Sequence, residues 1–169
     1  MRYAITGHTQ GIGKAIYEKL TPNCMGFSKS NGYDVTISKD RQRIIEESIE
    51  CDVFINNASD GRGHHMGQTL LLTDLFYIWK DLDKKIINVG SKIAEYAEAI
   101  YEPKLLGYQA EKLILKEMSI KLAETKVKCK IEYKWFGYVG TEIILKKYPH
   151  FKYPEHYISI DEAVMIILN

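Results

Sequence analysis

The stretch Tyr3-Ala4-Ile5-Thr6-Gly7-His8-Thr9-Gln10-Gly11-Ile12-Gly13-Lys14-Ala15-Ile16 decides the fold. A short apolar strand runs into a glycine-rich turn, and an amphipathic helix follows to about residue 20. Gly7 lets the chain leave the strand sharply, Gly11 lets a phosphate approach the backbone, and Gly13 lets the helix pack close to the strand. The first amides and the positive dipole end of that helix would then face the phosphate. The stretch predicts a nucleotide-binding turn, although a tight connection without a ligand has the same glycines.

Size and patterning favour a single α/β domain over residues 1–169. A chain of 169 residues with 46% hydrophobic content can bury one substantial core but not two. Apolar runs alternate with helical patterns along its length, which is typical of a parallel sheet covered on both faces. We expect about six strands, one starting at Tyr3 and the others at 24–28, 33–37, 52–56, 85–89 and about 127–134. The helices are expected at about 11–20, 39–50, 68–80 and 103–124, with a short last one from Ser159 through Leu168.

Charge and cysteine content narrow the partners and the compartment. The formal net charge of +1 gives no electrostatic reason to expect nucleic acid or an acidic membrane as a partner. Cys24, Cys51 and Cys129 are widely separated and odd in number, which favours reduced thiols in the cytoplasm. The sequence shows no leader and no long apolar run. The adjacent His64 and His65 lack partners at ligand spacing, so we expect no metal.

One tyrosine and one lysine are spaced to act together. Tyr108 and Lys112 are four residues apart on an expected helix and therefore share a face. A fixed cation near a phenol favours the phenolate and lowers its pKa, so the pair could transfer a proton at a carbonyl or alcohol. Ser91 follows the strand at 85–89, at the edge where open α/β folds bind ligands. A chance Tyr-x-x-x-Lys match and a serine that merely caps a helix are the alternatives.

Taken together, these motifs resemble those of the short-chain dehydrogenase/reductase family. The run from Thr6 to Gly13 is similar to its Thr-Gly-x-x-x-Gly-x-Gly turn. Asn56-Asn57-Ala58 with Ser59 resembles its Asn-Asn-Ala-Gly signature, Asp34-Val35 its adenine-contacting Asp-Val, and 137–141 its nicotinamide-embracing stretch. The resemblance implies a Rossmann-type doubly wound parallel sheet.

The resemblance also implies roles for individual residues. Tyr108 would be the general acid/base, Lys112 would hold the nicotinamide ribose and lower the tyrosine pKa, and Ser91 would orient the reacting carbonyl. The implied cofactor-binding residues are Gly7, Thr9, Gln10, Gly11, Ile12, Gly13, Ser28, Lys29, Asp34, Val35, Asn57, Ala58, Ser59, Tyr108, Lys112, Gly137, Val139 and Thr141.

The end of the second strand indicates which dinucleotide is used. An acidic residue there would bind the ribose 2′-hydroxyl and repel a phosphate. Ser28, Lys29 and Ser30 instead offer hydroxyls and a cation. We therefore expect NADP(H) rather than NAD(H), while a solvated Lys29 with no such role is the alternative.

The sequence departs from the family at several positions. Ser59 replaces a glycine, and Phe136 replaces a proline. The family's catalytic asparagine has no clear counterpart: His65 is nearest, with Gln68 close by. The family's seventh strand is not expected, which leaves the strand at 127–134 as an edge. The segment 148–154 occupies the place of the substrate loop, and its aromatics could cover the nicotinamide or simply pack on the sheet.

These expectations lead to a function and to alternatives. The leading hypothesis is an NADP(H)-dependent oxidoreductase acting on a small carbonyl or alcohol. A non-catalytic NADP(H)-binding sensor or assembly subunit is the second, and a sugar-nucleotide epimerase or dehydratase is a remote third. The family pairs the helices at 68–80 and 103–124 across a dimer, and we expect a homodimer or homotetramer. The apolar side chains expected to contribute surface there are Leu70, Leu72, Leu75, Phe76 and Trp79.

Overall fold

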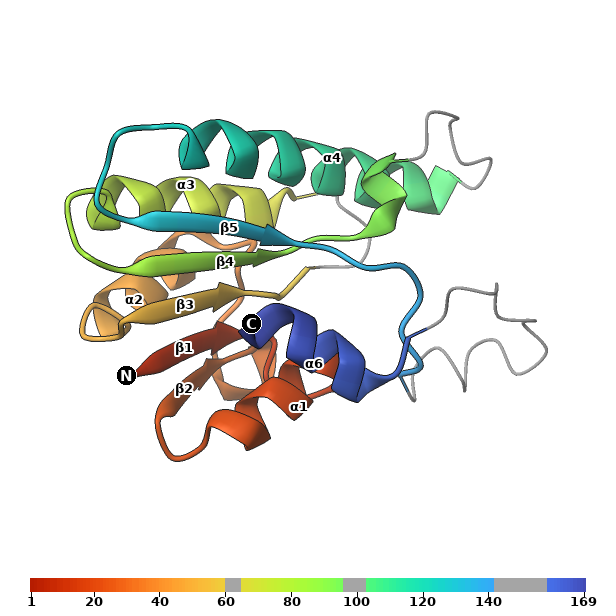
Figure 1. Cartoon of the computed structure of the whole chain (residues 1–169), viewed down its shortest axis with the longest axis horizontal. Helices are drawn as coiled ribbons and strands as arrows, with labels where there is room; N and C mark the ends of the chain where they lie inside the picture. Colours follow the sequence, from red (N-terminus) through yellow and green to blue (C-terminus); the bar gives the residue numbers. More distant parts are fainter. Residues whose placement is uncertain (60–64, 96–102, 142–157) are drawn as a thin grey trace.

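The computed structural model describes residues 1–59, 65–95, 103–141 and 158–169, and within these ranges one parallel sheet organises the chain (Figure 1). The strands are β1 (Tyr3–Thr6), β2 (Cys24–Phe27), β3 (Val53–Asn56), β4 (Lys85–Val89) and β5 (Lys130–Lys134). They lie in the order β2-β1-β3-β4-β5, and every neighbouring pair is parallel. The predicted doubly wound parallel sheet is confirmed. Its carboxyl edge gathers the ends of all five strands.

Helices cover both faces of the sheet, as its apolar strands require. The α-helices are α1 (Gly11–Leu20), α2 (Ser38–Glu47), α3 (Gly67–Trp79), α4 (Pro103–Ala123) and α6 (Ile160–Leu168), with short 3-10 turns η1 (Lys29–Asn31) and η2 (Lys92–Glu95). In Figure 1, α1 and α6 lie in front of the sheet, whereas α2, α3 and α4 lie behind it. The front core contains Ile16 and Ile167, and the rear core contains Leu71 and Leu115. The helices therefore match the predicted ones to within a few residues.

The strand predicted at 33–37 is wrong, and its residues form a turn. The Asp34 carboxylate accepts hydrogen bonds from the backbone N–H and the hydroxyl of Thr36, at 2.9 and 2.8 Å. The backbone carbonyl of Asp34 accepts the N–H of Ile37. Aspartate competes in this way with strand pairing, because its short side chain bonds the nearby backbone. As a result the sheet formed by the described residues has five strands rather than about six, and β2 is an edge strand.

The other edge of the sheet agrees with the prediction. β5 is an edge strand, with Ile131 buried and Lys130 exposed. Glu132 is ion-paired with Lys85 of β4 at 2.7 Å, which ties the edge strand to its neighbour. The predicted capping box at the last helix is also present, because Ser159 and Glu162 exchange hydrogen bonds.

The prediction for the apolar surface of α3 is partly wrong. Leu72, Leu75 and Trp79 are fully buried in the rear core rather than exposed. Leu70 is exposed as expected, and Tyr77 and Ile78 join it. A helix against a sheet that is itself apolar must bury most of its apolar side chains. Only part of the apolar surface expected on α3 is therefore exposed.

The described residues contain no helix long and apolar enough to cross a membrane. Cys24, Cys51 and Cys129 are free thiols buried in the core. The predictions for the loop at 60–64 and for the segment 148–154 lie outside the described residues.

Candidate functional site

The glycine turn between β1 and α1 closes as tightly as its sequence predicts. A Cβ atom built at Gly13 would lie 2.1 Å from the carbonyl oxygen of Gly7, so only glycine fits there. Gly7 and Gly11 have φ angles of 74° and 54°, in the left-handed region that glycine adopts freely. The first turn of α1 therefore starts directly beside the end of β1, with Thr9 and Gln10 exposed above it. Ile12 packs against the front core.

The loop after β3 is fastened to the glycine turn. The Thr6 hydroxyl accepts hydrogen bonds from the backbone amides of Asn57 and Ala58, at 3.0 and 2.9 Å. The Asn57 side chain returns a bond to the carbonyl of Thr6 at 3.0 Å. Residues predicted from two separate motifs, the glycine turn and the loop after β3, therefore lie side by side.

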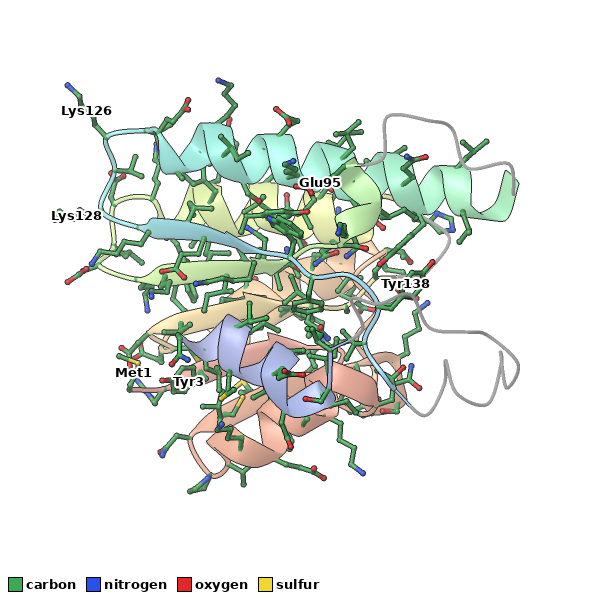
Figure 2. The ribbon with its side chains drawn as sticks, turned by 45° about the vertical axis from the view of Figure 1, so that its right-hand side comes forward. Met1, Tyr3, Glu95, Lys126, Lys128 and Tyr138 are labelled. Atoms are coloured by element: carbon green, nitrogen blue, oxygen red, sulfur yellow. The ribbon has the colours of Figure 1, made fainter. Side chains whose placement is uncertain are left out.

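The stretch after β5 reaches the same turn. A Cβ atom built at Gly11 would contact the methyl group of Thr141 at 3.5 Å, so Thr141 lies over the turn. Val139 is buried and forms a bridge with Ile158, and Gly137 precedes it at intermediate exposure. Phe136, which replaces the family's proline, is buried in the front core. Figure 2 shows Tyr138 toward the end of the sheet opposite to Met1 and Tyr3.

At the end of β2, the predicted phosphate-binding groups already have partners. The Lys29 ammonium forms an ion pair with the Asp34 carboxylate at 2.8 Å, although the lysine side chain is 66% exposed. The Ser28 hydroxyl shares a hydrogen bond with Ser30 at 2.8 Å. Val35 is buried beside Gly67. The site thus offers one accessible cation, which a bound anion would compete for with Asp34.

Ser91, Tyr108 and Lys112 come together at the carboxyl edge of β4. The hydroxyl of Tyr108 lies close enough to the Ser91 side chain for Ser91 to favour the ionised phenol. The Ser91 hydroxyl also accepts the backbone N–H of Ile93 at 3.3 Å, so it caps η2 as well. The Lys112 ammonium lies 5.4 Å from the centre of the Tyr108 ring. The predicted constellation is therefore assembled in space.

The electrostatics of this pair differ from the prediction. Burial raises the pKa of Tyr108, and the neighbouring Ser91 side chain only partly opposes that effect. Burial lowers the pKa of Lys112 to about 8, against the attraction of Glu111. The expected lowering of the tyrosine pKa by Lys112 is absent in this structure, because desolvation dominates for both groups. The phenol thus keeps its proton at neutral pH.

Of the two residues considered for the family's asparagine, Gln68 is the one that contacts Lys112. Its side-chain carbonyl accepts a hydrogen bond from the Lys112 ammonium, which also donates to the carbonyl of Val89 at 3.1 Å. His65, the residue nearest to that position in sequence, is exposed. The helical spacing alone could not distinguish the two, since it does not show which side chain points inward.

Glu111 belongs to the site and was not predicted. It is completely buried between Tyr108 and Lys112 in the sequence of α4. Its carboxylate accepts the hydroxyl of Ser59 at 3.0 Å and the backbone N–H of Gln68 at 3.2 Å. One signal in the sequence pointed to it: Ser59, at a position where the family has glycine, offers a hydroxyl that can donate to a buried carboxylate.

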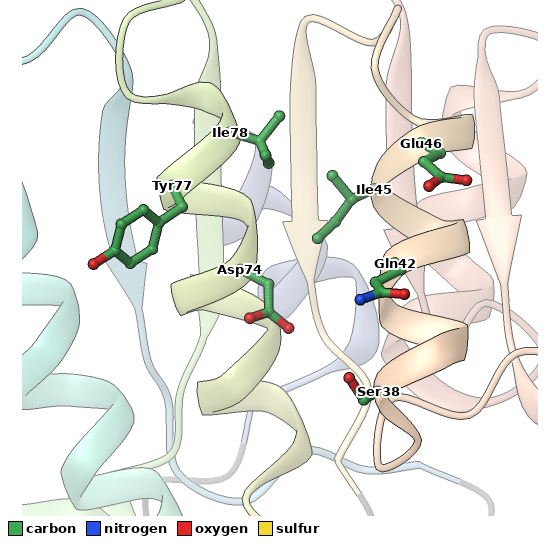
Figure 3. A pocket seen from close by; sticks show the side chains of 7 residues that line it. All are labelled: Ser38, Gln42, Ile45, Glu46, Asp74, Tyr77 and Ile78. Atoms are coloured by element: carbon green, nitrogen blue, oxygen red, sulfur yellow. The ribbon is translucent and has the colours of Figure 1, made fainter.

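A shallow groove elsewhere on the surface does not include these residues. It has a volume of about 330 Å³ and lies between α2 and α3 (Figure 3). Asp74, one of its lining residues, pairs with the buried Arg41 at 2.8 Å. Its lining residues are Ser38, Gln42, Ile45, Glu46, Asp74, Tyr77 and Ile78. Neither the glycine turn nor Tyr108 contributes to this groove.

Comparison with known proteins identifies the fold. No protein-family model matches the sequence, and no curated protein matches it either. Among solved structures, the chain is similar to a short chain dehydrogenase from Burkholderia cenocepacia J2315 in complex with NADP. The TM-score is 0.76 at 20% identity, over 99% of this chain and 84% of that one.

Two further solved structures extend this likeness. One is the closed form of serine dehydrogenase complexed with NADP+, with a TM-score of 0.74 at 16% identity, over 99% of this chain and 88% of that one. The other is an NADH-dependent reductase A1-R′ responsible for alginate metabolism, with a TM-score of 0.69 at 18% identity, over 99% and 87%. The likeness covers nearly the whole chain, including the carboxyl edge of the sheet.

Proposed function

We propose that this chain, which has the fold of short-chain dehydrogenases/reductases, is an NADP(H)-dependent oxidoreductase acting on a small carbonyl or alcohol. The observation that carries the proposal is the arrangement of Tyr108. Its hydroxyl lies close enough to Ser91 for that side chain to favour the ionised phenol, and the Lys112 ammonium lies 5.4 Å from its ring centre. Serine, tyrosine and lysine meet at the strand ends, where α/β folds bind ligands.

The residues around the glycine turn fit a dinucleotide. Gly13 allows the approach of α1 to the end of β1, so the first turn of the helix is available to a pyrophosphate. Of the other predicted cofactor contacts, Asn57, Ala58 and Thr141 lie beside this turn, and Ser28 and Lys29 follow β2. Lys29 and Ser28 would meet a 2′-phosphate, which favours NADP(H). The structures of relatives in complex with NADP or NADP+ support this choice, whereas the NADH-dependent reductase weighs against it.

In carbonyl reduction, Tyr108 would donate its hydroxyl proton to the substrate oxygen and later recover a proton from solvent. A nicotinamide, when bound, supplies the hydride that reaches the carbonyl carbon. Ser91 would hold the substrate oxygen beside the phenol. Lys112 has three N–H donors, and the described residues accept two of them, so one can serve a ribose hydroxyl.

Replacing Tyr108 by phenylalanine tests the acid/base assignment. We expect Tyr108→Phe to lower turnover by about 10²-fold or more, since general acid catalysis contributes roughly that much. NADPH affinity, measured by fluorescence transfer, should change little. Tyr77→Phe is the matched control, because Tyr77 is 71% exposed on α3. Wild-type turnover in Tyr108→Phe would show that another group transfers the proton.

A non-catalytic NADP(H)-binding sensor or assembly subunit is the second candidate. The observation that favours it is that the Lys112 ammonium is buried and already engaged by Gln68 and Val89. Tight NADPH binding without turnover over a broad panel of aldehydes and ketones would support this candidate. Hydride transfer to any of these carbonyls would exclude it.

The same proposal includes self-association through α3 and α4 in a cytoplasmic protein. Exposed apolar side chains on these helices are Leu70, Tyr77, Ile78, Leu106, Leu113, Ile114 and Ile120. Burying such side chains against a second copy would remove them from water. Sedimentation at micromolar protein should give a dimer or tetramer, and a monomer would contradict this part of the proposal. The free thiols favour a reducing compartment.

A further inference from the structure

A buried carboxylate joins three parts of the candidate site. Glu111 has no exposed surface, and it lies on α4 directly before Lys112. It accepts the Ser59 hydroxyl from the loop after β3 at 3.0 Å and the Gln68 N–H from the first turn of α3 at 3.2 Å. A buried carboxylate is costly unless it is paired and hydrogen-bonded. A buried glutamate at this position is therefore expected to have a role beyond packing.

The beginning of α3 shows one reason. The N-cap residue of α3 is Met66, which has a φ angle of 51° and makes no side-chain capping bond. A methionine cannot accept the backbone amides that a helix start leaves free. Glu111 supplies the missing acceptor from a different helix, and its negative charge faces the positive dipole end of α3.

The neighbouring lysine shows a second reason. Burial lowers the pKa of Lys112 to about 8, and the charge of Glu111 is what raises it among the described groups. Titratable groups on the packed elements also include Tyr108 on α4, Tyr133 on β5, and the ion-paired Glu95 and Lys116 on η2 and α4. Glu111 and Lys112 both contact Gln68, so removing the Glu111 charge would take away the negative charge whose attraction raises the pKa of the buried ammonium.

We propose that Glu111 is a positioning residue whose buried carboxylate locks α4 to the loop after β3 and to the start of α3, and balances the charge of Lys112. The consequence for catalysis rests on the proposed oxidoreductase function. The hydrogen bonds by which Glu111 joins the three segments do not depend on that function. Ser59 and Glu111 form one unit, since the hydroxyl of Ser59 donates to the carboxylate.

The titration of Lys112 tests the charge directly and requires no turnover. Lysines labelled with ¹³C at Cε are followed by NMR against pH, and the Lys112 signal is assigned by its loss in Lys112→Arg. Glu111→Gln keeps a hydrogen-bond acceptor but removes the charge. We expect its Lys112 midpoint to fall by roughly one pH unit. The matched control Glu117→Gln, at an exposed position of the same helix, should leave the midpoint unchanged.

Two more variants separate charge from structure. Ser59→Gly removes the hydroxyl but keeps the charge, so its Lys112 midpoint should stay within a few tenths of a unit of wild type. If Glu111→Gln does not fold, Glu111→Asp replaces it and should keep the midpoint near the wild-type value, because its charge remains. An unchanged midpoint in folded Glu111→Gln, or an equal shift in Ser59→Gly or Glu111→Asp, would overturn the proposal.

Kinetics provide the functional readout. The alkaline limb of kcat/KM for carbonyl reduction should move to lower pH in Glu111→Gln by the same amount as the Lys112 midpoint. An unchanged alkaline limb of kcat/KM together with a shifted Lys112 midpoint would overturn the catalytic part of the proposal. If the wild-type protein reduces no carbonyl, the proposed function fails, whereas the titration still decides the role of Glu111.

Discussion

The side-chain amide of Gln68 accepts a hydrogen bond from the buried ammonium of Lys112. The same amide donates to the carbonyls of Asn56 and Val89, at 2.6 and 2.9 Å. One side chain of α3 therefore connects α4 with the carboxyl ends of β3 and β4. Because all of these groups are buried, each depends on its partner in the network for the hydrogen bonds that water would otherwise supply.

Replacing Gln68 by leucine should break this network. The substitution preserves approximate size but removes the donor to the Asn56 carbonyl and the acceptor of the Lys112 ammonium, at about 1–3 kcal/mol for each unsatisfied group. We expect Gln68→Leu to lower the free energy of unfolding by about 3 kcal/mol, measured by urea denaturation. Gln42→Leu, at an exposed position of α2, should change it by less than about 0.5 kcal/mol. Equal stabilities of the two variants would contradict the network.

Adding one methyl group at Gly13 should disturb the glycine turn. Alanine at a helical position normally gains about 1 kcal/mol over glycine. Here its Cβ would lie 2.1 Å from the Gly7 oxygen and 2.6 Å from the Asn57 amide nitrogen, so the turn must open. We expect Gly13→Ala to be destabilised by at least about 2 kcal/mol and to lose NADPH affinity.

Gly32→Ala provides the control for backbone strain. Its φ is 88°, but nothing lies within 4 Å of the added Cβ. It should cost only about 1 kcal/mol and leave NADPH binding intact. Gly13→Ala at least as stable as wild type would show that the turn can relax.

Most of the fold could be predicted because its signals are local and repeated. The strand and helix patterns of 24–28, 52–56, 85–89 and 103–124 each have the period and length that burial in a parallel sheet demands. The segment 33–37 has the same alternation, yet its polar residues bond to one another. Asp34 accepts from Thr36 and pairs with Lys29, and these contacts replace a sheet ladder. Alternation alone does not reveal such competition.

The site was predictable where a motif defines it and not where burial does. Ser91, Tyr108 and Lys112 follow from their spacing and their places in the chain. Glu111 could not be found in the same way, since a glutamate on a helix usually faces solvent. Its burial depends on Ser59 and on the start of α3, which are distant in sequence. The polar interior of a site is therefore where sequence patterns carry the least information.

Lys29 should set the preference between the two dinucleotides. Removing its ammonium takes away a charge-assisted bond to a 2′-phosphate and frees the Asp34 carboxylate, which would repel that phosphate. We expect Lys29→Ala to weaken NADPH binding about tenfold and NADH binding less than threefold, as measured by fluorescence titration. Lys19→Ala, at the far end of α1, is the control. Equal effects of Lys29→Ala on both cofactors would place the phosphate elsewhere.

The pH dependence of the two reaction directions should follow from the buried groups. Reduction requires the phenol of Tyr108 with its proton, and burial raises its pKa, so that proton is retained through neutral pH. Lys112 ionises with a pKa of about 8 and loses its charge first as the pH rises. We therefore expect kcat/KM for carbonyl reduction to stay constant from about pH 6 to 7 and to fall through about pH 8. Alcohol oxidation, which requires the phenolate, should instead increase with pH up to the same limb.

Steady-state rates in both directions measure this pH dependence, with buffer ionic strength held constant. A decline of reduction between pH 6 and 7 would mean that the phenol ionises earlier than its burial allows, and Tyr108 would not be the proton donor.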